Sequence, residues 1–255
     1  MGRIKLRSVR NIRDFSDIVN RSGYKIKNGL FFRSSVLHDL APKDVKILYD
    51  EYKLKTVIDL RTKMEISEKP DIVPDNVDYI SIPIFDDSVF GITHEEETRQ
   101  KFHIPNMEEL YRGIVTDDFS VNALRQVFQA IFRAYEKGPV LWHCTVGKDR
   151  CGIVSALFLY LLDADIETIF EDYLMTNRAV NLEAMKYYCL ILLHSRNREV
   201  AQKVRKAFIA DRNYLQAALD AISEKYGSID SFLAKELYIT EDMKKRLREY
   251  SLVPE

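Results

Sequence analysis

The chain has 255 residues, and its 38 Lys and Arg residues nearly balance 39 Asp and Glu residues, for a formal net charge of −1. This balance excludes a global field that would recruit nucleic acid or an anionic membrane, so any attraction for anions must be local. Three cysteines are too few for a disulfide framework in a chain of this length, which favours a reducing compartment.

The N-terminal sequence "MGRIKLRSVRN" lacks the apolar core of a secretory signal. The longest apolar runs, residues 153–162 and 189–193, are too short to span a membrane. We therefore expect no stable membrane insertion and a cytoplasmic location by default, with secretion left open. The sequence gives no indication of the oligomeric state.

Short β-type segments alternate with helical patterns in the first half of the chain. The segments rich in β-branched and aromatic residues predict strands at 29–35, 55–60, 77–84 and 139–143. Apolar residues at three- to four-residue spacing predict helices at 42–53, 95–102, 106–115 and 119–136. Gly138 and Pro139 mark the turn between the last of these helices and the last strand.

The second half of the chain reads as helical throughout. Residues 151–163 are apolar on nearly every side, which predicts a central, buried helix. Residues 207–227 predict one helix ending at Gly227. We expect an α/β fold with a central sheet flanked by helices and an all-helical C-terminal layer or lid. One domain would span 1–255, with an α/β core to about residue 165 and a helical elaboration over 166–255.

The stretch "WHCTVGKDRCG", residues 142–152, concentrates reactive side chains between a predicted strand and a predicted helix. A loop in this setting can point several backbone N–H groups inward, supported by the positive end of the helix dipole. Such a cradle stabilises the thiolate of Cys144 and then a bound phosphate. Arg150 can hold two phosphate oxygens at once, and Gly147 permits a tight turn. The loop would thus supply a nucleophile, an anion site and a clamp.

These residues resemble a known family. "HCTVGKDRCG" fits the His-Cys-x5-Arg signature of cysteine-dependent protein phosphatases, and its Gly-Lys-Asp-Arg run resembles the bacterial tyrosine/dual-specificity phosphatases called tyrosine phosphatase family 3. The resemblance covers most of the chain, because further segments match in order: 11–15, 28–35, 57–71, 78–86 and 226–233.

The resemblance implies a cysteine-phosphatase-like sheet and a metal-independent phosphomonoesterase without a cofactor. It would hydrolyse phosphotyrosine, and also phosphoserine, phosphothreonine and phosphoinositides, through a phosphocysteine intermediate. Cys144 would be the nucleophile, Arg150 the transition-state clamp, and His143 would orient the loop. The phosphate-binding positions would be Thr145, Val146, Gly147, Lys148, Asp149 and Arg150.

The general acid has more than one candidate. The resemblance assigns an acid/base role to Asp149, which we prefer. Asp86 or Asp87, after the strand 77–84, could instead lie on a mobile loop, as the acid does in related families.

Two neighbouring residues raise further hypotheses. Lys148 adds a positive charge that phosphotyrosine does not require, which favours multiply phosphorylated substrates. Cys151 stands where the family has Thr or Ser. Because a thiol is a weaker hydrogen-bond donor than a hydroxyl, we expect slower breakdown of the phosphoenzyme. A reversible disulfide between Cys144 and Cys151 is an alternative use of this residue, and a simple packing role is another.

Three other functions are compatible with parts of this sequence. An inositol polyphosphate phosphatase would use the same loop, a non-enzymatic phosphate-binding module would not need Cys144, and a rhodanese-like sulfur transferase would not need the Lys-Asp-Arg run. The histidines outside the loop lack metal-ligand spacing, so no metal site is expected. Cys189 is expected in the core, and residues 94–102 as a surface helix or part of a lid.

Overall fold

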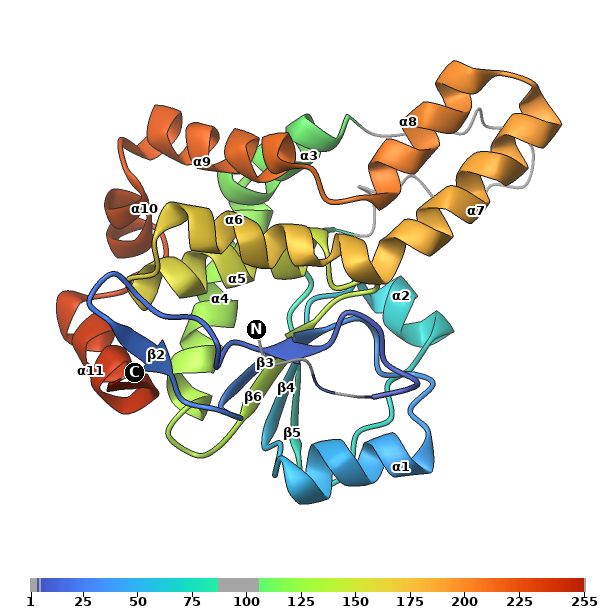
Figure 1. Cartoon of the computed structure of the whole chain (residues 1–255). Coiled ribbons are helices and arrows are strands. Elements are labelled where there is room, and N and C mark those ends of the chain that lie inside the picture. Colours follow the sequence, from blue (N-terminus) through green and yellow to red (C-terminus); the bar gives the residue numbers. More distant parts are fainter. Residues whose placement is uncertain (1–3, 5, 87–105, 255) are drawn as a thin grey trace.

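The structure is a computed structural model that describes residues 4, 6–86 and 106–254. A twisted five-stranded sheet lies at its centre, with helices on both faces (Figure 1). The strands of this sheet are β1 (Arg13–Asp14), β3 (Phe31–Ser34), β4 (Thr56–Asp59), β5 (Asp78–Ser81) and β6 (Val140–His143). A separate antiparallel pair joins β2 (Tyr24–Ile26) to β7 (Leu252–Pro254), near the C-terminus.

The strand order β1-β3-β6-β4-β5 places β6 at the centre of the sheet. Strands β3, β6, β4 and β5 are parallel, and β1 pairs antiparallel to β3. In this register His143, the last residue of β6, lies between Ser34 and Asp59, the last residues of its two neighbours. The residues that follow these three strands therefore meet at one edge of the sheet, where parallel α/β sheets bind their ligands.

Alternation along the strands divides the core into two parts. Phe31, Ile58 and Trp142 belong to the larger hydrophobic cluster, which lies under the central helices. Phe32 and Val57 point to the opposite face and pack in the smaller cluster with the segment after β3. Because both faces are covered, the strands are apolar on both sides, as is typical of parallel sheets.

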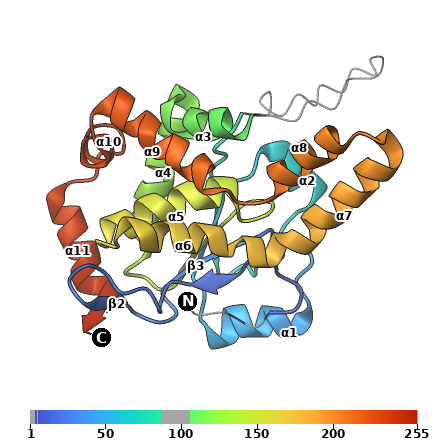
Figure 2. The same cartoon turned by 45° about the horizontal axis from the view of Figure 1, so that its top comes forward.

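Helices make up most of the remaining described chain. Before the central strand they are α1 (Pro42–Val45), the π-helix η1 (Lys46–Glu51), α2 (Lys63–Glu68), α3 (Met107–Thr116) and α4 (Asp118–Ala134). After it they are α5 (Asp149–Leu161), α6 (Ile166–Met175), α7 (Asn177–Ser195), α8 (Arg198–Phe208), α9 (Arg212–Tyr226), α10 (Ile229–Lys235) and α11 (Glu241–Ser251). Helices α7 and α8 form a hairpin that projects from the body of the molecule (Figures 1 and 2).

The predicted α/β class, with helices flanking a central sheet, is confirmed. All four predicted strands contain an observed strand, and α5 is the buried helix expected, although it begins two residues earlier than predicted, at Asp149. The helix expected over 42–53 has only one α-helical turn and continues as η1. The helix expected over 207–227 is two helices, because Asp211 caps a new N-terminus at α9. The expected helix 95–102 lies outside the described residues.

Two expectations for the C-terminal half are wrong. The chain does not end in helix, because β7 adds a strand that pairs with β2. Cys189 is exposed rather than in the core. The physical reason is the α7–α8 hairpin, since α7 buries only Val180 and Ala184 and leaves its apolar run open to solvent.

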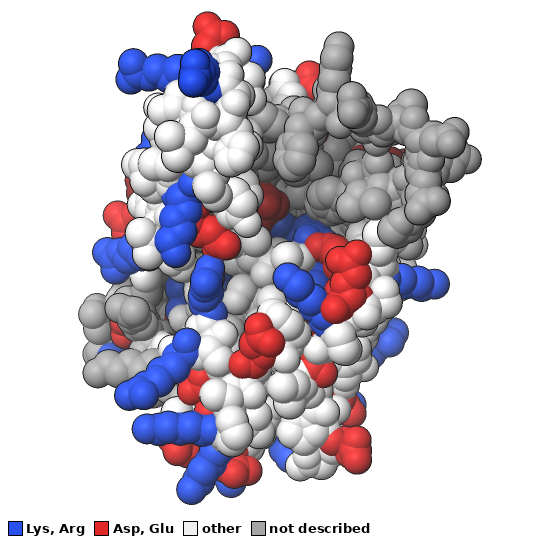
Figure 3. Space-filling model, turned by 90° about the vertical axis from the view of Figure 1, so that its right-hand side faces the viewer, with Lys and Arg blue, Asp and Glu red and all other residues white. Residues whose placement is uncertain are grey.

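In the part of the chain that the structure describes, no helix combines the length and apolar character needed to cross a bilayer. Basic side chains are interspersed with acidic ones on the face that includes the tip of the hairpin (Figure 3). This mixture agrees with the balanced composition, and it leaves the attraction for anions to local sites.

Candidate functional site

The loop 144–148 connects the central strand β6 to the buried helix α5. Its carbonyl groups are bound from outside the loop. The Thr145 carbonyl accepts a hydrogen bond from the Val36 amide at 3.3 Å, and the Asn11 side-chain amide donates to the Val146 and Gly147 carbonyls at 3.2 and 2.8 Å. Because a trans peptide places its N–H opposite its C=O, the amides that follow these carbonyls face the inside of the loop.

The nucleophile candidate lies inside this cradle. The Gly147 amide donates to the Cys144 Sγ at 3.2 Å. Burial alone would raise the pKa of the Cys144 thiol, but hydrogen bonds from the Cys151 side chain and backbone and the charge of Arg150 outweigh it and lower the pKa to about 5. A cysteine with this pKa is a thiolate at neutral pH, which is the reactive form.

Gly147 is required by the fit between the loop and strand β3. Its φ is +71°, in the left-handed region that favours glycine. A Cβ at this position would lie 2.4 Å from the Ser34 carbonyl oxygen, which is part of the backbone and cannot move aside alone.

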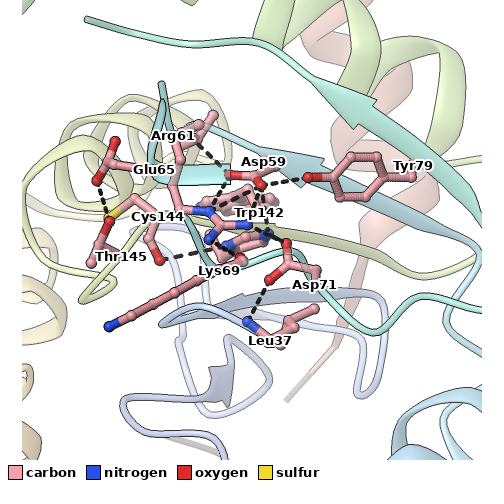
Figure 4. Close-up of polar contacts among 12 residues, drawn as sticks. Leu37, Asp59, Arg61, Glu65, Lys69, Asp71, Tyr79, Trp142, Cys144 and Thr145 are labelled. Atoms are coloured by element: carbon pink, nitrogen blue, oxygen red, sulfur yellow. Dashed lines mark hydrogen bonds and ion pairs between the residues drawn. The ribbon is translucent and has the colours of Figure 1, made fainter. Parts of the chain in front are cut away.

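Arg150 lies in the first turn of α5 and is held by a carboxylate from α2. Its Nη1 and Nη2 donate to the two Glu65 oxygens at 2.6 and 2.9 Å, and Nη2 also lies 3.3 Å from Thr145 Oγ1. The Thr145 hydroxyl donates to Glu65 in turn (Figure 4). Burial would raise the pKa of Glu65, yet the bonds from Arg150 and Thr145 lower it to about 2. The guanidinium is therefore oriented before any phosphate binds.

Local sequence explains the position of Glu65. Thr62 caps α2 by accepting a hydrogen bond from the Glu65 amide, and the Glu65 carboxylate accepts one from the Thr62 amide. This reciprocal capping box fixes the first turn of the helix. The carboxylate that caps α2 is thus also the partner of Arg150.

A buried ionic cluster supports the loop next to His143 (Figure 4). Arg61 binds Asp59 at 2.7 Å and Asp71 at 2.8 Å, and His143 Nε2 lies 2.9 Å from Asp71. Burial lowers the pKa of His143, but the bond to Asp71 and the charge of Asp59 raise it more. Tyr79 completes the cluster by donating to Asp59 at 2.6 Å. His143 therefore lies in the position expected of a residue that orients the loop.

The same cluster was tested as a cation site. Asp59, Asp71 and His143 offer ligand atoms within 4.8 Å of one another, the one such group among the described residues. However, the Arg61 guanidinium donates to both carboxylates. A metal ion would have to displace a fully buried cation, so the residues present do not fit a metal site.

A second buried cluster fixes the opposite side of the loop. Asp172 of α6 binds Arg13 at 2.8 Å and Arg33 at 2.6 Å, and Arg33 donates onward to the Gly147 carbonyl at 2.7 Å. Burial would raise the pKa of Asp172, but the two arginines lower it. The loop is thus bound directly by Arg33 of β3, which is held by Asp172 of α6.

Lys148 contributes its backbone to the loop, while its side chain extends to the end of α8. The amine donates to the Ala207 carbonyl at 2.5 Å and to the Ile209 carbonyl at 3.3 Å, and it lies 3.2 Å from Asp149 Oδ1. The residue is only 2% exposed. In this arrangement the lysine charge acts on Asp149 and on the start of the α8–α9 connection.

The two general-acid candidates differ in their surroundings. Asp149 is the first residue of α5, and its Oδ1 accepts a hydrogen bond from the Tyr111 hydroxyl at 2.7 Å. Asp86 is exposed and follows Phe85, whose ring centre lies 5.4 Å from the Arg150 guanidinium carbon. The structure thus places Asp149 directly after the loop, and Asp86 next to a residue that contacts Arg150. Asp87 lies outside the described residues, as does the segment 94–102.

Sequence reasoning identified the loop but missed most of its partners. Asn11 and Glu65 contact the loop, Tyr111 contacts Asp149, and Asp172 holds the arginine that binds Gly147; all four come from elements distant in sequence. Glu65 carried a detectable signal, the Thr-x-x-Glu spacing of a capping box directly after a strand. Tyr111 and Asp172 lie on amphipathic helices without any local feature that sets them apart.

Cys144, an inward-facing amide cradle and a clamping arginine at the end of a central parallel strand define the anion site of a cysteine-dependent phosphatase. Residues 4–253 match the tyrosine phosphatase family, and the chain belongs to that family. It is therefore a protein-tyrosine phosphatase by family.

The chain is similar in sequence to two known phosphatases, and one solved structure aligns with it weakly. The chain is 29% identical to the triple specificity protein phosphatase PtpB of Mycobacterium tuberculosis, over 88% of this chain and 90% of that protein. A tyrosine-protein phosphatase of Nostoc commune is 34% identical over 47% of this chain and 39% of its own length. The catalytic core of the PP-IP phosphatase SIW14 from S. cerevisiae aligns over 88% of this chain and 96% of its own, with 13% identity and a TM-score of 0.38.

Proposed function

We propose that the loop catalyses phosphomonoester hydrolysis in two steps through a phosphocysteine. In the first step the Cys144 thiolate forms a bond to phosphorus, the bond from phosphorus to the ester oxygen breaks, and Asp149 gives its proton to the leaving oxygen. In the second step water attacks phosphorus, Asp149 takes a proton from it, and the sulfur–phosphorus bond breaks to release phosphate and the thiolate.

The observation that carries the proposal is the state of Cys144 before substrate binds. Its lowered pKa of about 5 and the bond from the Gly147 amide describe a preformed anion site. Arg150 and the inward amides would bind the equatorial oxygens of the phosphoryl group and stabilise the charge of the transition state. No step requires a metal.

Asp149 is the proposed general acid, and Asp86 is the alternative. Asp149 belongs to the same rigid turn as Arg150, so its distance from the phosphoryl group is fixed by α5. Asp86 is supported by its place after Phe85, which contacts the clamp. Asp149→Asn and Asp86→Asn separate the two, because only loss of the acid slows substrates with poor leaving groups.

The proposed substrates are phosphotyrosine proteins, with phosphoserine, phosphothreonine and phosphoinositides as further candidates. This range of substrates is supported by the similarity to PtpB, which is named a triple specificity protein phosphatase. The Lys148 amine is bound to the Ala207 and Ile209 carbonyls and lies beside Asp149, so its charge would act on a substrate through Asp149 and not by direct contact. An inositol polyphosphate phosphatase is the second candidate function. Lys148→Ala assayed on phosphotyrosine peptide and on inositol lipid would show whether the lysine affects one substrate class more.

The decisive experiment measures phosphate release from a phosphotyrosine peptide and from phosphoinositide vesicles, with EDTA present. Wild type should hydrolyse the peptide, and Cys144→Ser should lose at least about 10⁴-fold in kcat while still binding it. Mass spectrometry of acid-quenched reactions should find phosphate on Cys144. Hydrolysis that survives Cys144→Ser, or that EDTA abolishes, would reject the mechanism.

A further inference from the structure

We infer that Tyr111 is a positioning residue for Asp149, which it orients so that the other carboxyl oxygen faces the leaving group. The inference rests on the proposed function, in which Asp149 is the general acid. Tyr111 lies on α3, outside the loop and 38 positions before Asp149, and nothing in the loop sequence indicates its role.

The contact between the two side chains is direct and shielded from solvent. The Tyr111 hydroxyl donates to Asp149 Oδ1 at 2.7 Å, and Tyr111 is fully buried. Lys148 also approaches Oδ1, at 3.2 Å. The contacts that the described residues make with this carboxyl group thus fall on one oxygen. Oδ2 is the oxygen left to carry the proton that the reaction transfers.

A second tyrosine fixes the first. The hydroxyls of Tyr173 and Tyr111 lie 2.7 Å apart, and because Tyr111 donates its own proton to Asp149, Tyr173 is the donor in this bond. Burial, and then the charge of Asp149, keep the pKa of both phenols well above the ordinary value, so both remain donors over the working pH range. Tyr173 thus donates a hydrogen bond to Tyr111, and Tyr111 donates one to the carboxyl group of Asp149.

The surrounding packing leaves these side chains little freedom. The rings of Tyr111 and Tyr173 meet edge to face with centroids 6.0 Å apart, and Tyr214 of α9 packs on Tyr111 at 5.8 Å. Gly152 makes room for Tyr173, since a Cβ there would lie 3.0 Å from its ring. Helices α3, α5, α6 and α9 therefore all fix the orientation of Asp149.

The value of kcat/KM reports the steps up to formation of the phosphocysteine and is independent of its later hydrolysis. A misplaced acid should therefore lower kcat/KM only for substrates whose leaving oxygen needs a proton. Phenyl phosphate releases a poor leaving group, whereas p-nitrophenyl phosphate releases one that departs without help. For Tyr111→Phe we expect kcat/KM on phenyl phosphate to fall about tenfold and kcat/KM on p-nitrophenyl phosphate to change by less than about twofold. The ratio of the two rates does not depend on the fraction of enzyme that is folded.

Tyr173→Phe is the matched control, because it removes an equally buried hydroxyl but leaves the bond from Tyr111 to Asp149. It should change the ratio of rates much less than Tyr111→Phe. Adding Tyr111→Phe to Asp149→Asn should have no further effect on the ratio, as expected when one residue acts through the other. An equal fall on both substrates would overturn the inference.

The two proposals fail in different ways. If Asp149→Asn slows phenyl phosphate but Tyr111→Phe does not, the positioning role is rejected and the mechanism stands. If Asp149→Asn leaves phenyl phosphate hydrolysis unchanged, the acid role of Asp149 is rejected, and the role of Tyr111 with it.

Discussion

Two buried arginines beside the loop, Arg61 and Arg150, each bind carboxylates, but their partners differ in access to solvent. Arg61 binds Asp59 and Asp71, whose side chains are 0% and 1% exposed. Arg150 binds Glu65, whose side chain is 26% exposed. The first pairing is closed on all sides, whereas the second meets solvent where a phosphate would enter.

The difference in solvent access distinguishes an arginine that stabilises the loop from one that takes part in the reaction. A fully enclosed pair holds its geometry because breaking it would leave an uncompensated buried charge. The Arg150 pair is also pre-oriented, but its guanidinium can share its donors with an incoming anion. We therefore expect substitutions in the Arg61 cluster to change stability, and substitutions at Arg150 to change the rate.

The largest effect should come from Arg150→Lys. Lysine keeps the charge but cannot bind two oxygens in one plane, so kcat/KM for p-nitrophenyl phosphate should fall about 10²- to 10³-fold. Steady-state kinetics on a variant with an unchanged melting temperature would establish this. A loss below about tenfold would mean that Arg150 is not the clamp.

Asp59→Asn should instead act on folding. It removes one of the two carboxylates that bind Arg61, so the free energy of unfolding should fall by about 3 kcal/mol in urea titrations. The kcat of the folded fraction should change far less than for Arg150→Lys. Equal loss of rate in both variants would erase the distinction between the two arginines.

The influence of Arg150 on Cys144 predicts a pH dependence. Because the pKa of Cys144 is lowered to about 5, the thiolate predominates above that pH and is lost below it. In a Cys189→Ser background, which removes the exposed cysteine, the rate of alkylation by iodoacetamide should rise with pH, with a midpoint near pH 5, and level off about one pH unit above it. In Arg150→Lys, which retains the charge, the midpoint should move little. A wild-type midpoint near the ordinary thiol value would contradict the preformed anion site.

The smallest effect is expected at Cys151. Burial, and then the neighbouring Cys144, raise the pKa of Cys151 well above the usual value, so it remains a thiol beside the nucleophile. Its Sγ lies 3.8 and 3.9 Å from the carbonyl oxygens of Ser34 and Trp142. Ser is a stronger donor at the same position, and Cys151→Ser should raise kcat about threefold by speeding release of the thiolate. Burst kinetics should show a larger steady-state rate with an unchanged burst. A lower turnover would favour a packing or redox role instead.

Local patterns were sufficient for the four parallel strands, for helix α5 and for the loop itself, because each is marked by residues that are neighbours in sequence. The sequence could not show that Tyr111 meets Asp149 or that Asp172 joins Arg13 to Arg33. Those contacts depend on how whole helices pack, and helix packing has no short-range signal. Cys189 was misplaced for the same reason, since an apolar run on a helix does not indicate whether a neighbour covers it.

The contact between Gly147 and strand β3 has a consequence for inhibitor design. Because the backbone oxygen of Ser34 lies so close to Gly147, there is no space for a compound to bind between the loop and the sheet. Selective ligands would have to approach from the solvent side and gain their discrimination from residues at the rim. Conversely, Gly147→Ala would disable the enzyme, because the added Cβ would distort the backbone of the loop although every reactive side chain is retained.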